Sequence, residues 1–322
     1  GPEAYRVHIY TFHAFCNDII QENLDYFGKL ELDAISELER VALLHQLIDQ
    51  FAAEHPLKRY HGDVYYEASR LQNLFSVMKR EDWSPSYVDE KIDDFITLIT
   101  ECDPDSIYYK EYKYNRKYKD KEAGSLKPAF DALLAKLAKL RAAVHEFPAY
   151  QQMMREAGRY DYDDMILWIL HAFKTDEQFL LNYQERYLYL LVDEYQDTSG
   201  AQNELIQLLA SYWDAPNIFV VGDDDQSIFR FQGANIQNIE EYNARYADDL
   251  YRVMLTDNYR STQPILDMAK VLIDYNTERI QLPGLSKVLA AKGENQESIQ
   301  PQINAYATPF HEFAAITHEI GE

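Results

Sequence analysis

The chain has 322 residues, which is long enough for about two domains and a sizeable core. Its 47% hydrophobic and 26% charged residues are typical of an ordinary soluble globular protein. The net charge of −23, from 31 basic and 54 acidic residues, argues against a uniformly basic nucleic-acid binder. It does not exclude a protein that binds nucleic acid in one basic groove and has acidic outer faces.

Cysteine content and hydropathy indicate the compartment. The two cysteines, Cys16 and Cys102, are too few for a disulfide framework, so we expect a cytoplasmic protein. The sequence shows no signal peptide and no apolar stretch near the roughly 18 residues of a membrane span, so we expect no membrane partner.

The first third of the chain predicts a helical module set into an α/β domain. A short predicted strand, 7–10, leads into Thr11, Phe12 and His13. From residue 30 to about 150 no convincing strand occurs, and apolar residues recur every three or four positions, as at Leu38, Val41, Leu44, Leu47, Ile48 and Phe51. We therefore predict an all-helical insertion over 30–150.

One stretch of the insertion, residues 108–127, is basic and rich in tyrosine. Seven basic residues against three acidic ones give it a net charge of +4, and five tyrosines are interleaved. Basic and aromatic residues together suit a nucleic-acid backbone with bases stacked nearby. The alternative is a solvated segment whose tyrosines pack inward, and both interpretations stay open.

After the insertion, predicted strands and helices alternate. The pattern predicts a helix at 163–173, a strand at 187–192, a helix at 201–212, a strand at 218–221, a helix at 235–246, a strand at 251–255, a helix at 264–275 and a helix from about 309. Alternation of this kind indicates an α/β fold with a parallel sheet.

Two of these strands end on acidic residues. The apolar run 187–192 ends at Asp193 and Glu194, and the run 218–221 ends at Gly222 and Asp223. Uninterrupted apolar runs predict strands buried on both faces, whose carboxyl ends meet at the ligand-binding edge of a parallel sheet. Mg²⁺ prefers oxygen ligands and keeps several waters, so this edge predicts a Mg-nucleotide site.

The two adjacent acids suit different tasks in phosphoryl transfer. Asp193 is placed to hold Mg²⁺ through water, and Glu194 to orient and deprotonate an attacking water. The alternative is that the pair belongs to the start of the next helix, with Thr198 or Ser199 as its actual cap.

Three motifs follow one another in the second half of the chain. They are Asp-Glu-Tyr-Gln-Asp from Asp193, Gly-Asp-Asp-Asp-Gln-Ser-Ile-Phe-Arg-Phe-Gln-Gly-Ala from Gly222, and Leu-Thr-Asp-Asn-Tyr-Arg-Ser from Leu255. With Thr-Phe-His ahead of them, the sequence strongly resembles the superfamily 1 DNA helicases of the UvrD/Rep/PcrA type. The resemblance covers most of residues 4–29 and 160–322, including the re-entry segment Tyr160–Ile166.

The resemblance implies a domain organisation. It implies an incomplete RecA-like motor domain 1A over 1–29 and 151–250, a 1B-like helical insertion over 30–150, and the start of a second RecA-like domain 2A over 251–322.

It also implies ATP and Mg²⁺ as cofactors. Asp193 would hold Mg²⁺ and Glu194 would activate the hydrolytic water. Gln226 would sense the γ-phosphate and couple it to DNA, while Tyr259 would stack on adenine. Arg260 would reach the γ-phosphate, because a planar guanidinium can bind phosphate with two hydrogen bonds. Apart from the resemblance, Arg260 would be interpreted as a surface ion-pairing residue.

The resemblance further implies a single-stranded DNA path. Thr11, Phe12 and His13 lie in the segment that contacts the strand in the family. Phe231 stands where the family commonly has a tryptophan, on which a base would stack for about 1–3 kcal/mol. Gln232 follows where arginine is frequent, and the alternative for Phe231 is a core aromatic.

The sequence also departs from the family. No Gly-x-x-x-x-Gly-Lys-Ser/Thr loop occurs in the chain, and the family's later motifs are missing. We therefore expect a piece of a larger ATP-dependent 3′→5′ helicase or translocase, acting on single-stranded and forked DNA in repair, replication or recombination. Alone, the piece should have no ATPase activity.

Two alternatives stay open. The chain could belong to the motor subunit of a helicase–nuclease resembling RecB or AddA, or it could be a non-enzymatic DNA-binding module centred on the helical insertion.

Overall fold

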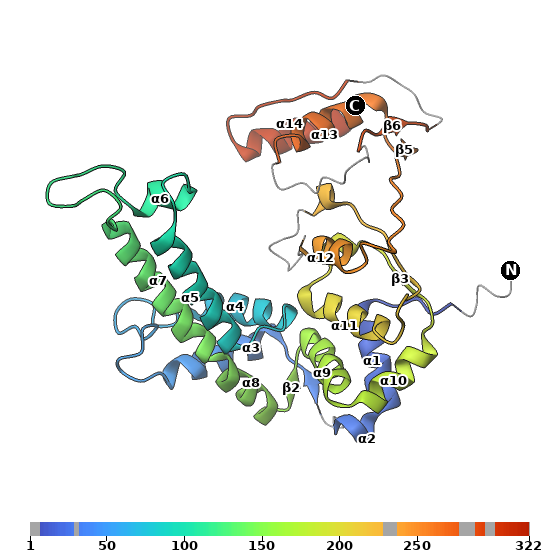
Figure 1. The fold of residues 1–322 in the computed structure, drawn as a ribbon, viewed down its shortest axis with the longest axis horizontal. Coiled ribbons are helices and arrows are strands. Elements are labelled where there is room, and N and C mark those ends of the chain that lie inside the picture. The colour runs from blue at the N-terminus through green and yellow to red at the C-terminus, as the bar shows by residue number, and fades with distance from the viewer. Residues whose placement is uncertain (1–6, 29–31, 228–236, 277–286, 294–299, 322) are drawn as a thin grey trace. The chain divides into compact units, whose positions relative to one another are not determined.

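The structure, a computed structural model, describes residues 7–28, 32–227, 237–276, 287–293 and 300–321. This part of the chain is mainly helical, with three short two-stranded parallel sheets (Figure 1). It divides into two compact units, Gly1–Gly222 with Ser227–Asn238 and Asp223–Gln226 with Ile239–Glu322. None of the described helices combines the length and apolar character that a bilayer span requires.

The chain enters the first unit through α1 (Phe12–Glu22), followed by the short α2 (Leu24–Phe27). The Thr11 hydroxyl accepts a hydrogen bond from the Ala14 amide at 3.2 Å and so caps α1. The strand predicted at 7–10 is wrong, since these residues form no regular structure and Ile9 is 89% exposed. An apolar run becomes a strand only beside a partner strand, and no described strand pairs with it.

The insertion consists of six helices among its described residues. They are α3 (Glu37–Asp49), α4 (Ala68–Arg80), α5 (Pro85–Glu101), α6 (Ile107–Tyr112), α7 (Pro128–His145) and α8 (Phe147–Glu156). A capping box between Ser36 and Glu39 begins α3, and Ser84 with Pro85 begins α5. Their apolar faces share one core, which includes Leu44, Leu47, Leu71, Phe75, Met78, Ile92 and Val144.

The insertion is not entirely helical, which corrects the prediction. A two-residue strand, β1 (Asp33–Ala34), pairs in parallel with β2 (Arg159–Tyr160), so a small sheet joins the two ends of the insertion. Between α6 and α7 the chain forms a hairpin, in which the Tyr114 amide donates to Ser125 O at 3.0 Å. The side-chain pattern gave no sign of either feature, because both pairings are very short.

Helices α9 (Tyr162–Thr175), α10 (Glu177–Arg186) and α11 (Gly200–Ala210) form a second core with α1. This core includes Cys16, Ile19, Ile169, Leu170, Phe173, Leu180 and Leu205. An Asp161–Asp164 capping box begins α9. The helices predicted at 163–173 and 201–212 are confirmed with small shifts of their ends, whereas α10 was not predicted.

Two predicted strands form and pair in parallel, as β3 (Leu190–Val192) and β4 (Ile218–Val220). Leu191 lies opposite Phe219 in the register. The prediction that both faces of these strands are buried is wrong, because Leu191 is 73% and Phe219 is 61% exposed. Leu190 packs against the second core, so helices cover one face of this sheet, and within the described residues the other face stays open.

The second unit holds most of α12 (Gln237–Arg245), together with α13 (Gln263–Ile273) and α14 (Pro309–Gly321). Its sheet pairs β5 (Asp257–Asn258) with β6 (Ala290–Ala291) in parallel. The strand predicted at 251–255 does not form there, since pairing begins two residues later, at Asp257. The three helices predicted in this part of the chain are confirmed.

Candidate functional site

The carboxyl ends of β3 and β4 are joined by hydrogen bonds that continue beyond the strands. The Val221 amide donates to Val192 O, and the Tyr195 amide donates to Val221 O, each at 2.9 Å. Gly222 follows, and a Cβ on it would lie 2.8 Å from Gln196 Oε1. Only glycine permits this approach, so the loop that carries Asp193 and Glu194 is closely packed against the end of β4.

Glu194 has an unusual backbone conformation. Its φ of 50° and ψ of 43° lie in the left-handed region, which a residue with a side chain adopts at a cost. The buried Gln196 donates through Nε2 to Glu194 Oε2 at 2.8 Å. The Glu194 amide donates to Asp193 Oδ1 at 3.0 Å. The first contact orients the Glu194 carboxylate and the second orients that of Asp193, although both side chains are exposed.

Buried polar contacts anchor the loop to α11. The Tyr195 hydroxyl donates to Asn203 Oδ1 at 2.5 Å, and Thr198 Oγ1 donates to Tyr195 O at 2.7 Å. Asn238 donates through Nδ2 to Thr198 O at 2.8 Å. Ser199 caps α11 in a capping box with Gln202, which confirms Ser199 as the cap that the alternative named, so neither Asp193 nor Glu194 caps α11.

The residues that support this loop were not predicted from the sequence. Tyr195 and Gln196 lie inside the Asp-Glu-Tyr-Gln-Asp motif, which was the available signal for them. Asn203 and Asn238 gave no signal, because their roles depend on contacts across the fold.

A third carboxylate, that of Asp197, interacts with Glu194. Burial raises the pKa of Asp197, the negative charge of Glu194 raises it further, and a hydrogen bond from Gln196 opposes the change. In the described part of the chain, no group of three or more acidic, histidine or cysteine side chains is arranged to hold a metal. Asp193 and Glu194 are exposed carboxylates at the strand ends, and Mg²⁺ commonly uses one or two carboxylates together with water and a nucleotide.

Gln226 lies in the second unit, where Asp223 positions it. Its side chain donates to Asp223 Oδ2 at 2.7 Å, and its amide donates to Asp223 O at 3.0 Å. Lys287 forms an ion pair with Asp224 and lies 3.9 Å from Asp225 Oδ1. The acids that precede Gln226 thus bind and orient this loop.

Tyr259 and Arg260 follow β5 and project into solvent. Tyr259 is 72% exposed, as a residue that stacks on a ligand must be before binding. Asn258 Oδ1 accepts hydrogen bonds from the Arg260 amide at 3.0 Å and the Ser261 amide at 2.8 Å, so it fixes the turn. The Arg260 guanidinium forms no ion pair with any described residue.

The predicted DNA-contact residues at the start of α1 have structural roles in the fold. Thr11 caps the helix, and Phe12 packs against the second core. His13 Nε2 lies 3.9 Å from Asp163 Oδ1, and its ring contacts Tyr162 edge-on at 6.0 Å. Phe231 lies outside the described residues.

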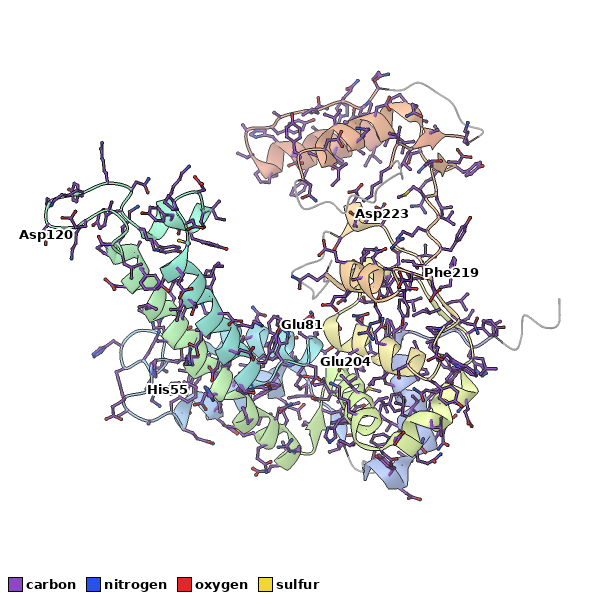
Figure 2. The ribbon with its side chains drawn as sticks, in the orientation of Figure 1. His55, Glu81, Asp120, Glu204, Phe219 and Asp223 are labelled. Carbon is purple, nitrogen blue, oxygen red and sulfur yellow. The ribbon has the colours of Figure 1, made fainter. Side chains whose placement is uncertain are left out.

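The basic segment 108–127 contains residues with structural roles and residues that are free to contact a ligand. Lys113 is buried and donates to Thr100 O at 2.7 Å and Cys102 O at 3.2 Å, at the end of α5. Near the tip, where Figure 2 labels Asp120, three exposed residues form no ion pair with any described residue: Arg116, Lys119 and Lys121. Lys113 is therefore structural, and the exposed tip is the part that can meet a polyanion.

Comparisons with known proteins agree with the motifs. The family model described as the UvrD/REP helicase N-terminal domain matches residues 1–247. The ATP-dependent DNA helicase PcrA of Leuconostoc citreum is 42% identical over 134 residues, which cover 42% of this chain and 18% of that protein. PcrA of Staphylococcus aureus is 41% identical over 133 residues, 41% of this chain and 18% of that protein. The chain therefore spans less than a fifth of the length of these relatives.

Proposed function

This chain belongs to the UvrD/REP helicase family, and from that premise we propose that it forms part of an ATP-dependent DNA helicase or translocase. Residues 1–29 and 151–250 represent an incomplete RecA-like motor domain, 30–150 a 1B-like insertion, and 251–322 the start of a second motor domain. The parent protein moves 3′→5′ on single-stranded DNA and opens forked DNA, in repair, replication or recombination. Both cysteines are free thiols, which suits the reducing cytoplasm.

The held carboxylate of Glu194 is the observation that carries this proposal. It lies beyond the joined ends of two parallel strands, in a left-handed conformation, with Gln196 fixing its orientation. A strained backbone that buried contacts maintain is typical of functional sites. Such a carboxylate can orient a water molecule and accept its proton as that water attacks a phosphate.

The family resemblance gives further residues roles in nucleotide binding. Asp193 holds the Mg²⁺ that, when bound with ATP, neutralises phosphate charge. Gln226, oriented by Asp223, senses the γ-phosphate, and the exposed Tyr259 stacks on adenine. Arg260 presents its guanidinium to the γ-phosphate from the turn that Asn258 fixes.

A DNA strand contacts the start of α1 in this proposal. Thr11 and His13 present polar groups to the strand, and Phe12 keeps the segment attached to the core. Phe231 provides the surface on which a base stacks.

The test uses Glu194→Gln in the parent protein, with Glu185→Gln on the exposed side of α10 as its matched control. We expect DNA-stimulated ATP hydrolysis to fall about 10²–10⁴-fold for Glu194→Gln, while ATP binding persists, because only the proton acceptor is lost. The control should hydrolyse ATP normally. Unchanged hydrolysis in Glu194→Gln would contradict the proposal.

The exposed hairpin tip favours a second candidate function, a DNA-binding module centred on the insertion. Arg116, Lys119 and Lys121 concentrate positive charge in a molecule of net charge −23. The stacked rings of Tyr114 and Tyr118, 5.9 Å apart, add an aromatic surface. Phosphate contacts of this kind bind DNA without any nucleotide chemistry.

Anisotropy titrations of single-stranded and forked DNA would test this module in the present chain. Arg116→Ala with Lys121→Ala should weaken binding and reduce the salt dependence of log K by about two contacts. Lys136→Ala with Lys139→Ala, which removes two exposed charges from α7, is the control. Binding that ignores salt or is equal in both double variants would exclude the module.

A further inference from the structure

Four consecutive charged residues, Lys79 to Asp82, connect the end of α4 with the helices that surround the predicted sites. Lys79 is fully buried, with Nζ 2.8 Å from Asp161 Oδ2 and 2.7 Å from Asp164 Oδ1. These two acids form the capping box of α9. The first residue of the segment thus fastens the insertion to the start of α9.

The next residue reaches the predicted DNA-contact segment. Arg80 Nε lies 3.4 Å from Asp163 Oδ2, and His13 Nε2 lies 3.9 Å from the other oxygen of the same carboxylate. Asp163 therefore stands between a residue of the insertion and a residue at the start of α1.

Glu81 contacts the first residue of α11. A Cβ on Gly200 would lie 2.6 Å from Glu81 Oε2 and 3.4 Å from Glu81 Cα, so a side chain at this position would displace the Glu81 carboxylate from the start of α11. Figure 2 labels Glu81 beside α11, which also carries Glu204. A carboxylate at this end of a helix is stabilised by the exposed amides there.

Asp82 completes the segment in a strained conformation. Its φ is 52°, and the Trp83 amide donates to Met78 O at 2.8 Å, which is the pattern of a Schellman motif. Glycine usually occupies this left-handed position. The Asp82 carboxylate instead pairs with Lys174 at 2.9 Å, and Lys174 pairs with Glu204 at 2.8 Å. These ion pairs connect Asp82 to α9 and α11, which a glycine at this position could not do.

We propose that residues 79–82, here called the α4 clamp, transmit the position of the insertion to the loop that carries Glu194. Glu81 positions that loop through α11, and Arg80 positions His13 through Asp163. α11 begins at Gly200, where Glu81 contacts it, and Asn203 one turn later holds Tyr195 beside Glu194. A shift of the insertion thus reaches the Glu194 loop through α11. Naming that loop as hydrolytic rests on the proposed function.

Hydrogen exchange followed by mass spectrometry tests the clamp in this chain without any ligand. In Glu81→Gln we expect amides of 193–199 to exchange at least about threefold faster, because the contact at the start of α11 weakens. Amides of α5 and α7 should not change. Glu90→Gln, on the exposed side of α5, is the matched control and should leave 193–199 unchanged.

A second variant approaches the same contact from the other side. Gly200→Ala forces Glu81 away, and it should accelerate exchange in 193–199 as Glu81→Gln does. Adding Glu81→Ala should relieve the clash without a further increase. Arg80→Gln should accelerate exchange at 12–15 alone.

If amide exchange accelerated only at 79–84 and 200–202, the contact would connect the two helices without positioning the Glu194 loop, and the proposal would be overturned. Since the measurement needs neither nucleotide nor DNA, its outcome is independent of whether Glu194→Gln abolishes hydrolysis.

Discussion

Gly222 shows how a single hydrogen atom in place of a side chain allows two loops to meet. Its ideal Cβ position lies 2.8 Å from Gln196 Oε1 and 3.2 Å from the Gln196 amide nitrogen, and that amide belongs to a loop with little room to move. Gln196 in turn orients the Glu194 carboxylate. Steric conflict at Gly222 therefore acts on both stability and the predicted site.

We predict that Gly222→Ala lowers the free energy of unfolding of the first unit by about 1–3 kcal/mol, the usual cost of overpacking. Urea denaturation followed by circular dichroism would measure it. Gly321→Ala is the control, because its Cβ would meet nothing within 4 Å and should leave stability almost unchanged. Equal stability of both variants would show that the Gln196 loop can move away from the added methyl group at little cost.

Glu39 offers a pH test of the helix cap at α3. Hydrogen bonds from the Ser36 amide and hydroxyl, followed by one from Arg159, lower the pKa of Glu39 to about 2. Because the folded-state pKa is depressed, this group adds stability above the unfolded pKa of about 4.5, and the stability is lost as pH falls towards 2.

An NMR titration of the Glu39 carboxyl should locate its midpoint near pH 2, and Ser36→Ala should move it upward. Stability measured against pH should then lose less between 4.5 and 2 in Ser36→Ala than in the parent sequence. Identical profiles would mean that the Ser36 hydroxyl does not help to hold the carboxylate, because Ser36→Ala keeps the backbone amide.

The sequence predicted the strand ends that carry Asp193 and Glu194 better than it predicted individual contacts. Asp193 and Glu194 were identified from the end of an apolar run, because strand ends and their acids are local signals. Lys113 was grouped with the basic residues of the hairpin, yet it is buried at the end of α5. Its partners are carbonyl groups, and these leave no trace in a side-chain pattern.

One buried ion cluster, Lys79 with Asp161 and Asp164, connects helix α4 of the insertion to helix α9. Burial alone would lower the pKa of Lys79, and the charges of Asp164 and Asp161 offset this and raise it. Removing the lysine charge would leave two carboxylates buried between α4 and α9 with their partner gone.

We predict that Lys79→Met lowers the free energy of unfolding by about 3–5 kcal/mol, as expected when one partner of a buried pair is removed. Lys91→Met is the matched control, since the Lys91–Asp94 pair is exposed and screened by solvent, so its loss should change stability little. Urea midpoints compared at one pH would separate the two. A Lys79→Met midpoint equal to that of the control would show that water already reaches the cluster.

Helices were predicted from the sequence more reliably than strands, and the reason is physical. Long amphipathic helices such as α3, α7 and α9 were predicted because their periodicity is local. The run at 7–10 has the composition of a strand but no described partner, and β1 has a partner but only two residues. Strand formation is decided by distant segments, so these two cases could not be predicted from local pattern.

The two units differ in the amount of apolar surface they bury. The first contains two cores, whereas in the described residues of the second unit Tyr242 is the only buried residue. Helices α13 and α14 bury no residue at all, although both have an apolar face. Burial must offset the entropy of ordering each residue, so these helices gain little stability in this chain.

We therefore predict that amides of α13 and α14 exchange on the time scale of local fraying, while those of α9 exchange only through unfolding of the first unit. Pulsed hydrogen exchange at neutral pH would compare the three helices in one sample. α9 buries six residues, including Ile169 and Leu170, and it serves as the internal reference. Protection of α13 and α14 equal to that of α9 would require a covering surface for their apolar faces. Fast exchange would instead show that α13 and α14 gain little stability from packing within this chain.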